Sequence, residues 1–137
     1  MLYIATPYSH SDPVVMQQRY KKSCIATAKL MAAGIVVFNP LANTVPVVEL
    51  GGLDLSHEQF MQLDIPILQR SDEILVVALD GWTESKGVKQ EMFEAFSLRK
   101  PITLIDEVDI ERLPAVPKHA RRFLTSSILT EVYDNAD

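Results

Sequence analysis

The sequence predicts an α/β protein, a Rossmann-like three-layer α/β/α sandwich with a mostly parallel sheet. Four short runs are rich in Ile, Val and Leu and do not alternate with polar residues, which is typical of strands covered by helices on both faces. Segments with helical periodicity alternate with these runs. Because 137 residues suit one domain with a real core, we expect a single domain over residues 1–137.

The expected elements follow one another in the order β-α-β-loop-α-β-α-β-α. The expected strands are Leu2–Ala5, Ile35–Phe38, Ile74–Leu79 and Ile102–Ile105. The expected helices are Pro13–Ala33, Ser56–Gln69, Ser85–Leu98 and Pro117–Leu129. Residues 39–55 carry two prolines and a glycine pair, so they are expected to form a long loop, and such loops in compact domains are often functional.

Two of the helices have clear start, stop or packing signals. Asp12 and Pro13 are good start signals for the first helix, and Gly34 is expected to end it. Its apolar residues at helical spacing are Met16, Tyr20, Cys24, Ala28 and Met31. The helix after the third strand is expected to bury Val88, Met92, Ala95 and Phe96.

Composition and charge exclude several classes of function. Apolar residues make up 47% of the chain and charged residues 23%, as in ordinary globular proteins. The net charge of -5 argues against a nucleic-acid partner. The single cysteine, Cys24, fits a reduced compartment, so we expect a cytoplasmic protein. No segment resembles a signal peptide or a membrane span.

Cofactor motifs are missing from the sequence. It contains no G-x-G-x-x-G and no G-x-x-x-x-G-K-[ST], so neither standard dinucleotide binding nor P-loop binding is indicated. No spacing of His, Cys, Asp and Glu resembles a metal site. His57 and His119 are expected at the surface, and Lys118, Arg121 and Arg122 on a solvated helix face. We therefore expect no metal and no organic cofactor.

Polar and aromatic side chains follow the expected strands where each one ends. Ligands of open α/β sheets bind beyond the carboxyl ends of the strands. Each of these residues can also have a purely structural role. Tyr8 and His10 are individually weak signals, and Trp82 can pack a loop as well as contact a base. The candidate substrate-binding residues are Tyr8, His10, Asn39, Asp80, Trp82, Ser85 and Gly87.

The stretch "DGWTESKGVKQEMFEAF" places an anion site at a helix start. Ser85 occupies the N-cap position, where its hydroxyl and the free N–H groups of the first turn face a ligand and the helix dipole favours an anion. Gly87 permits close approach of a ligand to the backbone. Glu91 lies about 60° round the helix from Val88, at the border of the buried stripe. A partly desolvated carboxylate at this position can act as a nucleophile or base. The alternative is that Glu91 is an ordinary solvated residue on the helix surface.

Two segments resemble the nucleoside 2-deoxyribosyltransferase-like proteins, over roughly the first 105 residues. They are "LYIATPYS" at the start and "QLDIPILQRSDEILVVALDGWTESKGVKQEMFEAFSLRKPITLI" from Gln62 to Ile105. The sequence also resembles a small uncharacterised bacterial and phage subgroup carrying "PYSH" and G-W-x-x-S-x-G-x-x-x-E. The resemblance implies the fold of that superfamily. It also implies a homo-oligomer, since members are oligomers whose sites are often completed by a neighbour.

The resemblance assigns roles to three residues. Glu91 matches the nucleophile, which attacks the anomeric carbon and forms a covalent glycosyl-enzyme as in retaining glycosidases. Asp64 matches the helix Asp that assists departure of the base. Ser85 stands where transferases carry a sugar-holding Asp and nucleotide N-hydrolases a phosphate-holding Ser. A neutral hydroxyl beside helix N–H groups suits a phosphate, whereas a carboxylate would repel it.

Three functions remain open from the sequence. The first is an N-glycosidase-type enzyme that cleaves the base–sugar bond of a (deoxy)nucleoside 5'-monophosphate. The second is a nucleotide-binding or sensing module in which Glu91 is dispensable. The third is deoxyribosyl transfer between bases, against which Ser85 argues. The partner in each case is a small-molecule nucleotide or nucleoside.

Overall fold

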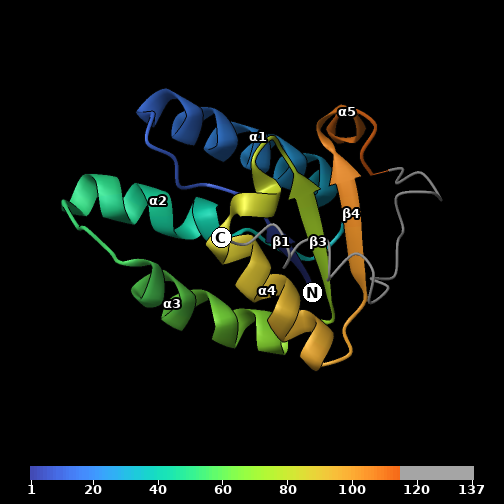
Figure 1. The fold of residues 1–137 in the computed structure, drawn as a ribbon. Helices are drawn as coiled ribbons and strands as arrows, with labels where there is room; N and C mark the ends of the chain where they lie inside the picture. Colours follow the sequence, from blue (N-terminus) through green and yellow to red (C-terminus); the bar gives the residue numbers. More distant parts are fainter. Residues whose placement is uncertain (115–137) are drawn as a thin grey trace.

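The computed structural model describes residues 1–114 (Figure 1). The expected helix Pro117–Leu129, with His119 and the basic cluster around it, lies outside the described residues. Within them, the strands are β1 (Leu2–Ala5), β2 (Val37–Phe38), β3 (Glu73–Ala78) and β4 (Ile102–Asp106). The helices are α1 (Pro13–Ala32), α2 (Pro40–Gly51), α3 (His57–Arg70), η1 (Trp82–Glu84, a 3-10 turn), α4 (Lys86–Ser97) and α5 (Glu107–Ile110).

The four strands form one parallel sheet in the order β2-β1-β3-β4. The chain leaves β1 for β2 on one side and returns to β3 on the other side, so the loops after β1 and β3 diverge. This point, where the strand order reverses, is where open parallel sheets form a ligand crevice. The prediction of a doubly wound, mostly parallel α/β fold is confirmed.

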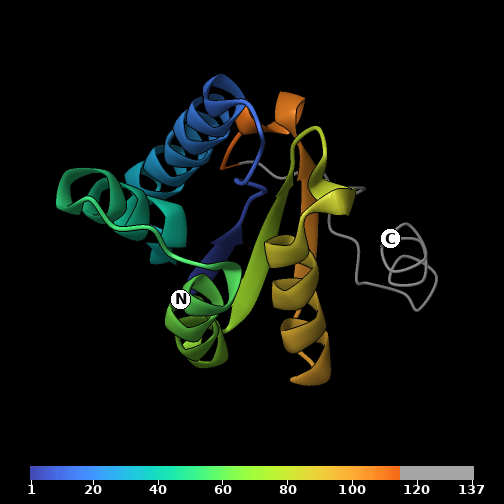
Figure 2. The ribbon, with the colours of Figure 1, turned by 60° about the vertical axis from the view of Figure 1, so that its left-hand side comes forward.

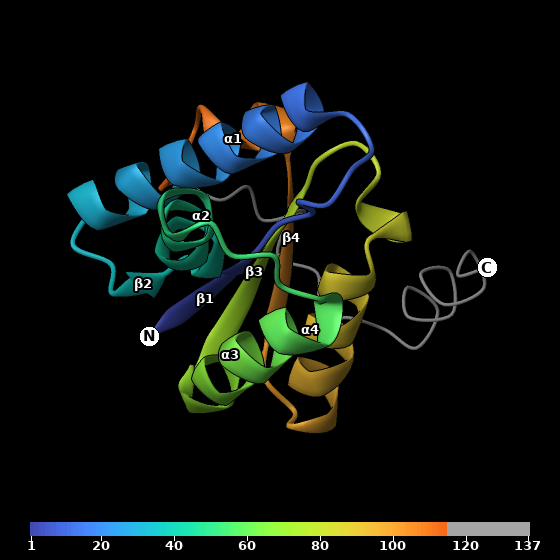
Figure 3. The same ribbon diagram turned by 90° about the vertical axis from the view of Figure 1, so that its left-hand side faces the viewer.

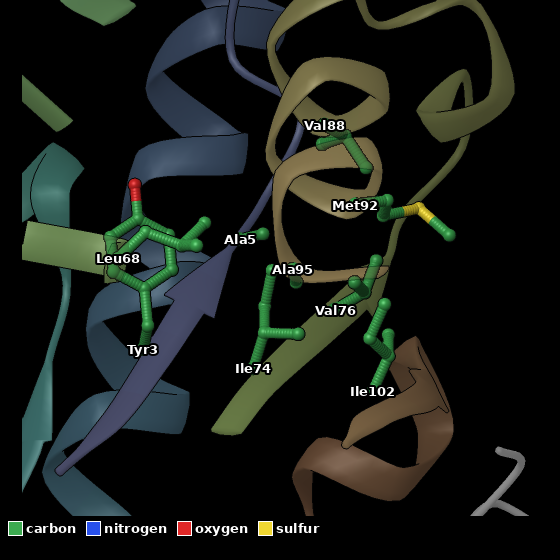
Figure 4. Close-up of a cluster of buried hydrophobic side chains, with 9 residues drawn as sticks. All are labelled: Tyr3, Ala5, Leu68, Ile74, Val76, Val88, Met92, Ala95 and Ile102. Carbon is green, nitrogen blue, oxygen red and sulfur yellow. The ribbon is translucent and has the colours of Figure 1, made fainter. Parts of the chain in front are cut away.

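Helices cover both faces of the sheet, with α1 and α5 on one side and α3 and α4 on the other (Figures 2 and 3). Alternate strand residues feed two separate cores. Ile4, Leu75 and Val77 pack with Ala26 and Leu30 of α1. The opposite core contains Tyr3, Ala5, Leu68, Ile74, Val76, Val88, Met92, Ala95 and Ile102 (Figure 4).

The prediction of a long loop over residues 39–55 was wrong, because most of this segment is α2. Asn39 caps the helix by accepting hydrogen bonds from the backbone N–H groups of Leu41 and Ala42, and Pro40 takes the first helical position, where no N–H is needed. Gly52 ends the helix in the left-handed conformation, with φ 65°. Pro46 lies inside the helix and misled the prediction, since proline usually breaks helices.

Two predicted burial patterns also need correction. Helix α1 buries Arg19, Ser23, Ala26 and Leu30, whereas Met31 is 62% exposed, so the predicted apolar stripe of α1 was wrong. Polar side chains are inside because the helix packs over loops as well as over the sheet. In α4 the burial of Val88, Met92 and Ala95 is confirmed, but Phe96 is 44% exposed.

Candidate active site

Two buried carboxyl groups lie in one cavity beyond the carboxyl ends of β1 and β3. This carboxylate cavity, of about 380 Å³, is bounded by the loop after β1 and by α2, α3 and α4. Glu91 and Asp64 are 5% and 7% exposed. The cavity is lined by Thr6, Tyr8, Ser9, Pro40, Leu41, Leu55, His57, Phe60, Met61, Asp64, Glu84, Ser85, Lys86, Gly87 and Glu91.

Glu91 is more deeply buried than the sequence suggested. Its pKa is raised from 4.5 to about 8, mainly by burial; the Tyr3 hydroxyl opposes the rise, and the negative charge of Asp64 adds to it. The Tyr3 hydroxyl nevertheless makes no hydrogen bond of ordinary geometry, and neither does Glu91 Oε2. The nearby Tyr3 hydroxyl therefore favours the charged form of Glu91 electrostatically. A small rearrangement would let this hydroxyl donate a hydrogen bond to the Glu91 carboxylate.

Asp64 titrates nearer to neutrality than an ordinary aspartate, because burial raises the pKa of its carboxyl from 3.8 to about 6. Coupled acids share their protons, so the two carboxyls hold about one proton between them at neutral pH. A covalent mechanism uses the form in which Glu91 is charged and Asp64 is protonated. Tyr3 stays neutral, since burial and the carboxylates raise its pKa far above the ordinary value.

The start of α4 faces the same cavity. Ser85 caps the helix as predicted, since its hydroxyl oxygen accepts a 3.3 Å hydrogen bond from the backbone N–H of Val88. Its hydroxyl hydrogen is still able to donate. Within residues 1–114, no acceptor meets the backbone N–H groups of Lys86 and Gly87. These donors, the helix dipole and the Lys86 ammonium make the rim attractive to an anion.

The backbone conformation of Gly87 does not call for glycine, because only Gly34, Gly52 and Gly81 among the described glycines have positive φ. A Cβ at Gly87 would lie 3.6 Å from Met61 Cε, 3.8 Å from Glu91 Oε1 and 3.9 Å from Ser85 Oγ. These are ordinary contacts, so a methyl group fits there when the cavity is empty. It would occupy room between the hydroxyl and the carboxyl.

Three predicted site residues line a neighbouring cavity instead. This Trp82 cavity, of about 670 Å³, contains His10, Asp80 and Trp82, and it shares Ser9, Glu84 and Ser85 with the carboxylate cavity. The Trp82 ring also packs against the core shown in Figure 4, so both interpretations of this residue have support. His10 Nδ1 accepts a 2.9 Å hydrogen bond from the backbone N–H of Asp12.

Asn39 lines neither cavity. Besides capping α2, its amide nitrogen donates to Ser23 Oγ at 3.1 Å and to Thr27 Oγ1 at 3.0 Å. Both hydroxyls already donate to carbonyl oxygens of α1, so they act as acceptors toward Asn39. The structure therefore places Asn39 as a clamp between α1 and α2, and Pro40 and Leu41, which follow it, line the carboxylate cavity in its place.

Arg19 is a further residue at this edge that sequence reasoning missed. Its buried guanidinium donates to the carbonyl oxygens of Ser9 at 2.9 Å and Asp80 at 2.7 Å, joining the loops after β1 and β3. Gly81, with φ 82°, lies against it, and a Cβ there would come within 2.6 Å of Arg19 Nη2. No sequence signal marked Arg19, because it lies outside the apolar stripe that was expected for this helix.

Tyr3 and Thr6 were also missed as site residues. Tyr3 was counted in an apolar strand, although a tyrosine inside a fully covered strand needs somewhere to place its hydroxyl. Thr6, directly after β1, has a buried hydroxyl with no hydrogen-bond partner and lines the carboxylate cavity. A buried hydroxyl of this kind, in the wall of a cavity, is able to bond a ligand.

The described residues show no metal or membrane feature. No group of three or more His, Cys, Asp or Glu within residues 1–114 is arranged to hold a metal ion. Among the described helices, none is both long and apolar enough to cross a membrane.

Fold and site together describe a parallel α/β domain with a pair of acids at its switch point. The chain belongs to the family DUF1937, described as a domain of unknown function, whose model matches residues 1–107. A comparison with curated proteins finds no match.

The fold is that of a 2-deoxyribosyltransferase. The solved 2-deoxyribosyltransferase of the psychrotolerant bacterium Bacillus psychrosaccharolyticus is similar at a TM-score of 0.58 and 20% sequence identity, covering 96% of this chain and 80% of that one. The resemblance noted from the sequence, to an uncharacterised family with a deoxyribosyltransferase-like fold, is confirmed.

Proposed function

We propose that the protein is an N-glycosidase-type enzyme that cleaves the base–sugar bond of a (deoxy)nucleoside 5'-monophosphate. The observation that carries the proposal is the placement of Glu91, Asp64 and Ser85 in one cavity, with Glu91 and Asp64 both buried. A solved structure of similar fold belongs to a 2-deoxyribosyltransferase, and this agrees with glycosidic chemistry.

In the proposed reaction Glu91 attacks the anomeric carbon as the C–N bond to the base breaks. Asp64 gives its proton to the departing base, and a glycosyl ester of Glu91 remains. Water then attacks the same carbon and displaces the Glu91 carboxylate, Asp64 takes one proton from the water, and the sugar phosphate leaves. The Tyr3 hydroxyl favours the charged form of Glu91 before attack and after release.

The phosphate in this proposal is held at the start of α4. Ser85 and the free N–H groups of Lys86 and Gly87 supply donors, and the Lys86 ammonium adds charge. The cavity is also lined by the apolar side chains of Leu41, Leu55 and Phe60, which suit a base. Tyr8 lines the cavity as well, and burial raises the pKa of its phenol, which keeps it neutral.

The test is a chromatographic assay for released base over a panel of ribo- and deoxyribonucleoside monophosphates and free nucleosides. Wild-type protein should release base from at least one monophosphate, and Glu91→Ala should not. Glu94→Ala, one turn further along α4, is the matched control and should keep the activity. An unchanged rate in Glu91→Ala would remove Glu91 from the mechanism.

Two other outcomes would redirect the assignment. Stable binding of an unaltered nucleotide, equal in wild type and Glu91→Gln, would indicate a binding module without chemistry. Product formed only after an acceptor base is added would indicate transfer between bases. A homo-oligomer is part of the same proposal, and light scattering of the purified protein tests it.

A further inference from the structure

The Trp82 cavity has no role in the proposed cleavage of a monophosphate, although it adjoins the carboxylate cavity. Ser85, Glu84 and Ser9 form the wall between the two cavities and line both of them. An anion held by Ser85 and the start of α4 would therefore sit at their junction. A group attached beyond that anion would enter the Trp82 cavity.

The sizes of the two cavities favour a substrate that extends past one phosphate. The carboxylate cavity, at about 380 Å³, is near the lower end of ligand pockets, which span about 300–1,000 Å³. It has room for one nucleotide and little more. The Trp82 cavity is larger, about 670 Å³, and shares Ser9, Glu84 and Ser85 with the carboxylate cavity.

Among the residues that line the Trp82 cavity, Arg19 carries a positive charge and Asp80 and Glu84 carry negative charges, so a second phosphate would have to lie toward Arg19. Arg19 is 9% exposed, and no carboxylate pairs with its guanidinium within residues 1–114. A buried cation that bonds only to carbonyl oxygens favours a nearby anion. Asp80 and Glu84 are exposed at the rim, where their carboxylates can accept hydrogen bonds from hydroxyl or amide groups. Trp82 offers a ring face for stacking.

We propose that the Trp82 cavity is a subsite for the second half of a nucleoside 5'-diphosphate conjugate, such as a dinucleotide or a sugar-linked nucleotide. This inference rests on the proposed function for the position of the scissile bond. The first phosphate sits at the start of α4, the second sits toward Arg19, and the terminal sugar or base lies against Trp82. The chemistry at Glu91 and Asp64 is unchanged.

Binding tests the subsite separately from turnover. Isothermal titration calorimetry of the Glu91→Gln protein would compare the affinities for three matched pairs of ligands. The pairs are nicotinamide mononucleotide with NAD, AMP with ADP-ribose, and UMP with UDP-glucose. In at least one pair the conjugate should bind at least tenfold more tightly than its monophosphate. Conjugates that bind no more tightly than their monophosphates, or that all fail to bind, overturn the proposal.

A blocking variant ties the preference to this cavity. Thr83 lines the Trp82 cavity but not the carboxylate cavity, so Thr83→Phe should fill the subsite and reduce the preference at least fivefold. Ser97→Phe, at an exposed position at the far end of α4, is the matched control and should keep the preference. A preference that survives Thr83→Phe overturns the assignment.

The two proposals can fail independently. Loss of base release from every nucleotide, with the conjugate preference intact, would remove the proposed cleavage and leave the subsite. Base release from monophosphates without any preference for conjugates would support the proposed cleavage and remove the subsite. Chromatography of the same six ligands with wild-type protein provides the turnover measurement.

Discussion

Replacing Glu91 with Gln should remove a pH dependence of stability that the wild-type protein shows between about pH 6 and pH 8. The folded protein holds the Glu91 proton up to a pKa of about 8, whereas the unfolded chain releases it near 4.5. Between these values the folded state binds one more proton. The free energy of unfolding therefore falls as the pH rises through this window and levels off above it.

The size of the effect follows from the same two values. A rise from 4.5 to about 8, at about 1.4 kcal/mol per pH unit, gives a loss of about 5 kcal/mol on going from acid to pH 9. Asp64 contributes a second fall, complete near its pKa of about 6. Only Glu91 acts above that point, so the fall between pH 6 and pH 8, of about 2–3 kcal/mol, belongs to Glu91.

Urea unfolding at pH 5, 6, 7, 8 and 9 provides the assay. Glu91→Gln should match the wild type within about 1 kcal/mol at pH 5, because an amide replaces a protonated carboxyl of similar shape. At pH 9 it should be more stable by about 3–5 kcal/mol. Glu94→Gln is the matched control, because the Glu94 carboxylate lies in an exposed hydrogen bond, which it accepts from Gln69 of α3. Parallel stability curves for wild type and Glu91→Gln would refute the reasoning.

Three further predictions follow from the site and the clamp. Gly87→Ala should stabilise the protein by about 0.5–1 kcal/mol in urea unfolding, because alanine favours the helical conformation more than glycine does. It should also lower kcat/KM at least tenfold, because the methyl group lies beside Glu91 Oε1. A destabilised or fully active variant would contradict this prediction. Asn39→Asp should keep the α2 cap but lose both hydrogen bonds to Ser23 and Thr27, which should lower the free energy of unfolding by about 1–3 kcal/mol. Calorimetry measures the change, and an unchanged melting temperature would mean that the clamp does not stabilise the protein. The pH profile of kcat/KM should be bell-shaped with limbs near 6 and 8, and a profile flat across this range would exclude the shared-proton pair.

Most of the fold was predictable from the sequence, because strand and helix signals were strong and local. Unbroken Val, Ile and Leu runs indicated covered strands, and Asp12, Ser56 and Ser85 marked helix starts that the structure has within one residue. Helix α2 was not predictable in this way. Pro46 argues against a helix locally, and the bonds that hold Asn39 to α1 depend on tertiary contacts.

The candidate site was predictable where it follows from topology and less so where it depends on packing. Strand ends had to meet at one edge, so Ser85, Gly87 and Tyr8 were identified from position alone, and they line one cavity with Glu91 and Asp64. The division into two cavities, with Trp82 and His10 in the second, depends on how η1 turns. The buried Arg19 could not be distinguished from a surface arginine by periodicity.

The stereochemistry of cleavage tests the central claim, that Glu91 forms a covalent glycosyl-enzyme, most directly. We would run the reaction on the preferred nucleotide in aqueous methanol and identify the methyl glycoside phosphate by NMR. Attack by Glu91 followed by methanol predicts the β-anomer, which retains the configuration of the nucleotide. Formation of the α-anomer would mean direct displacement of the base by solvent and would contradict the role assigned to Glu91.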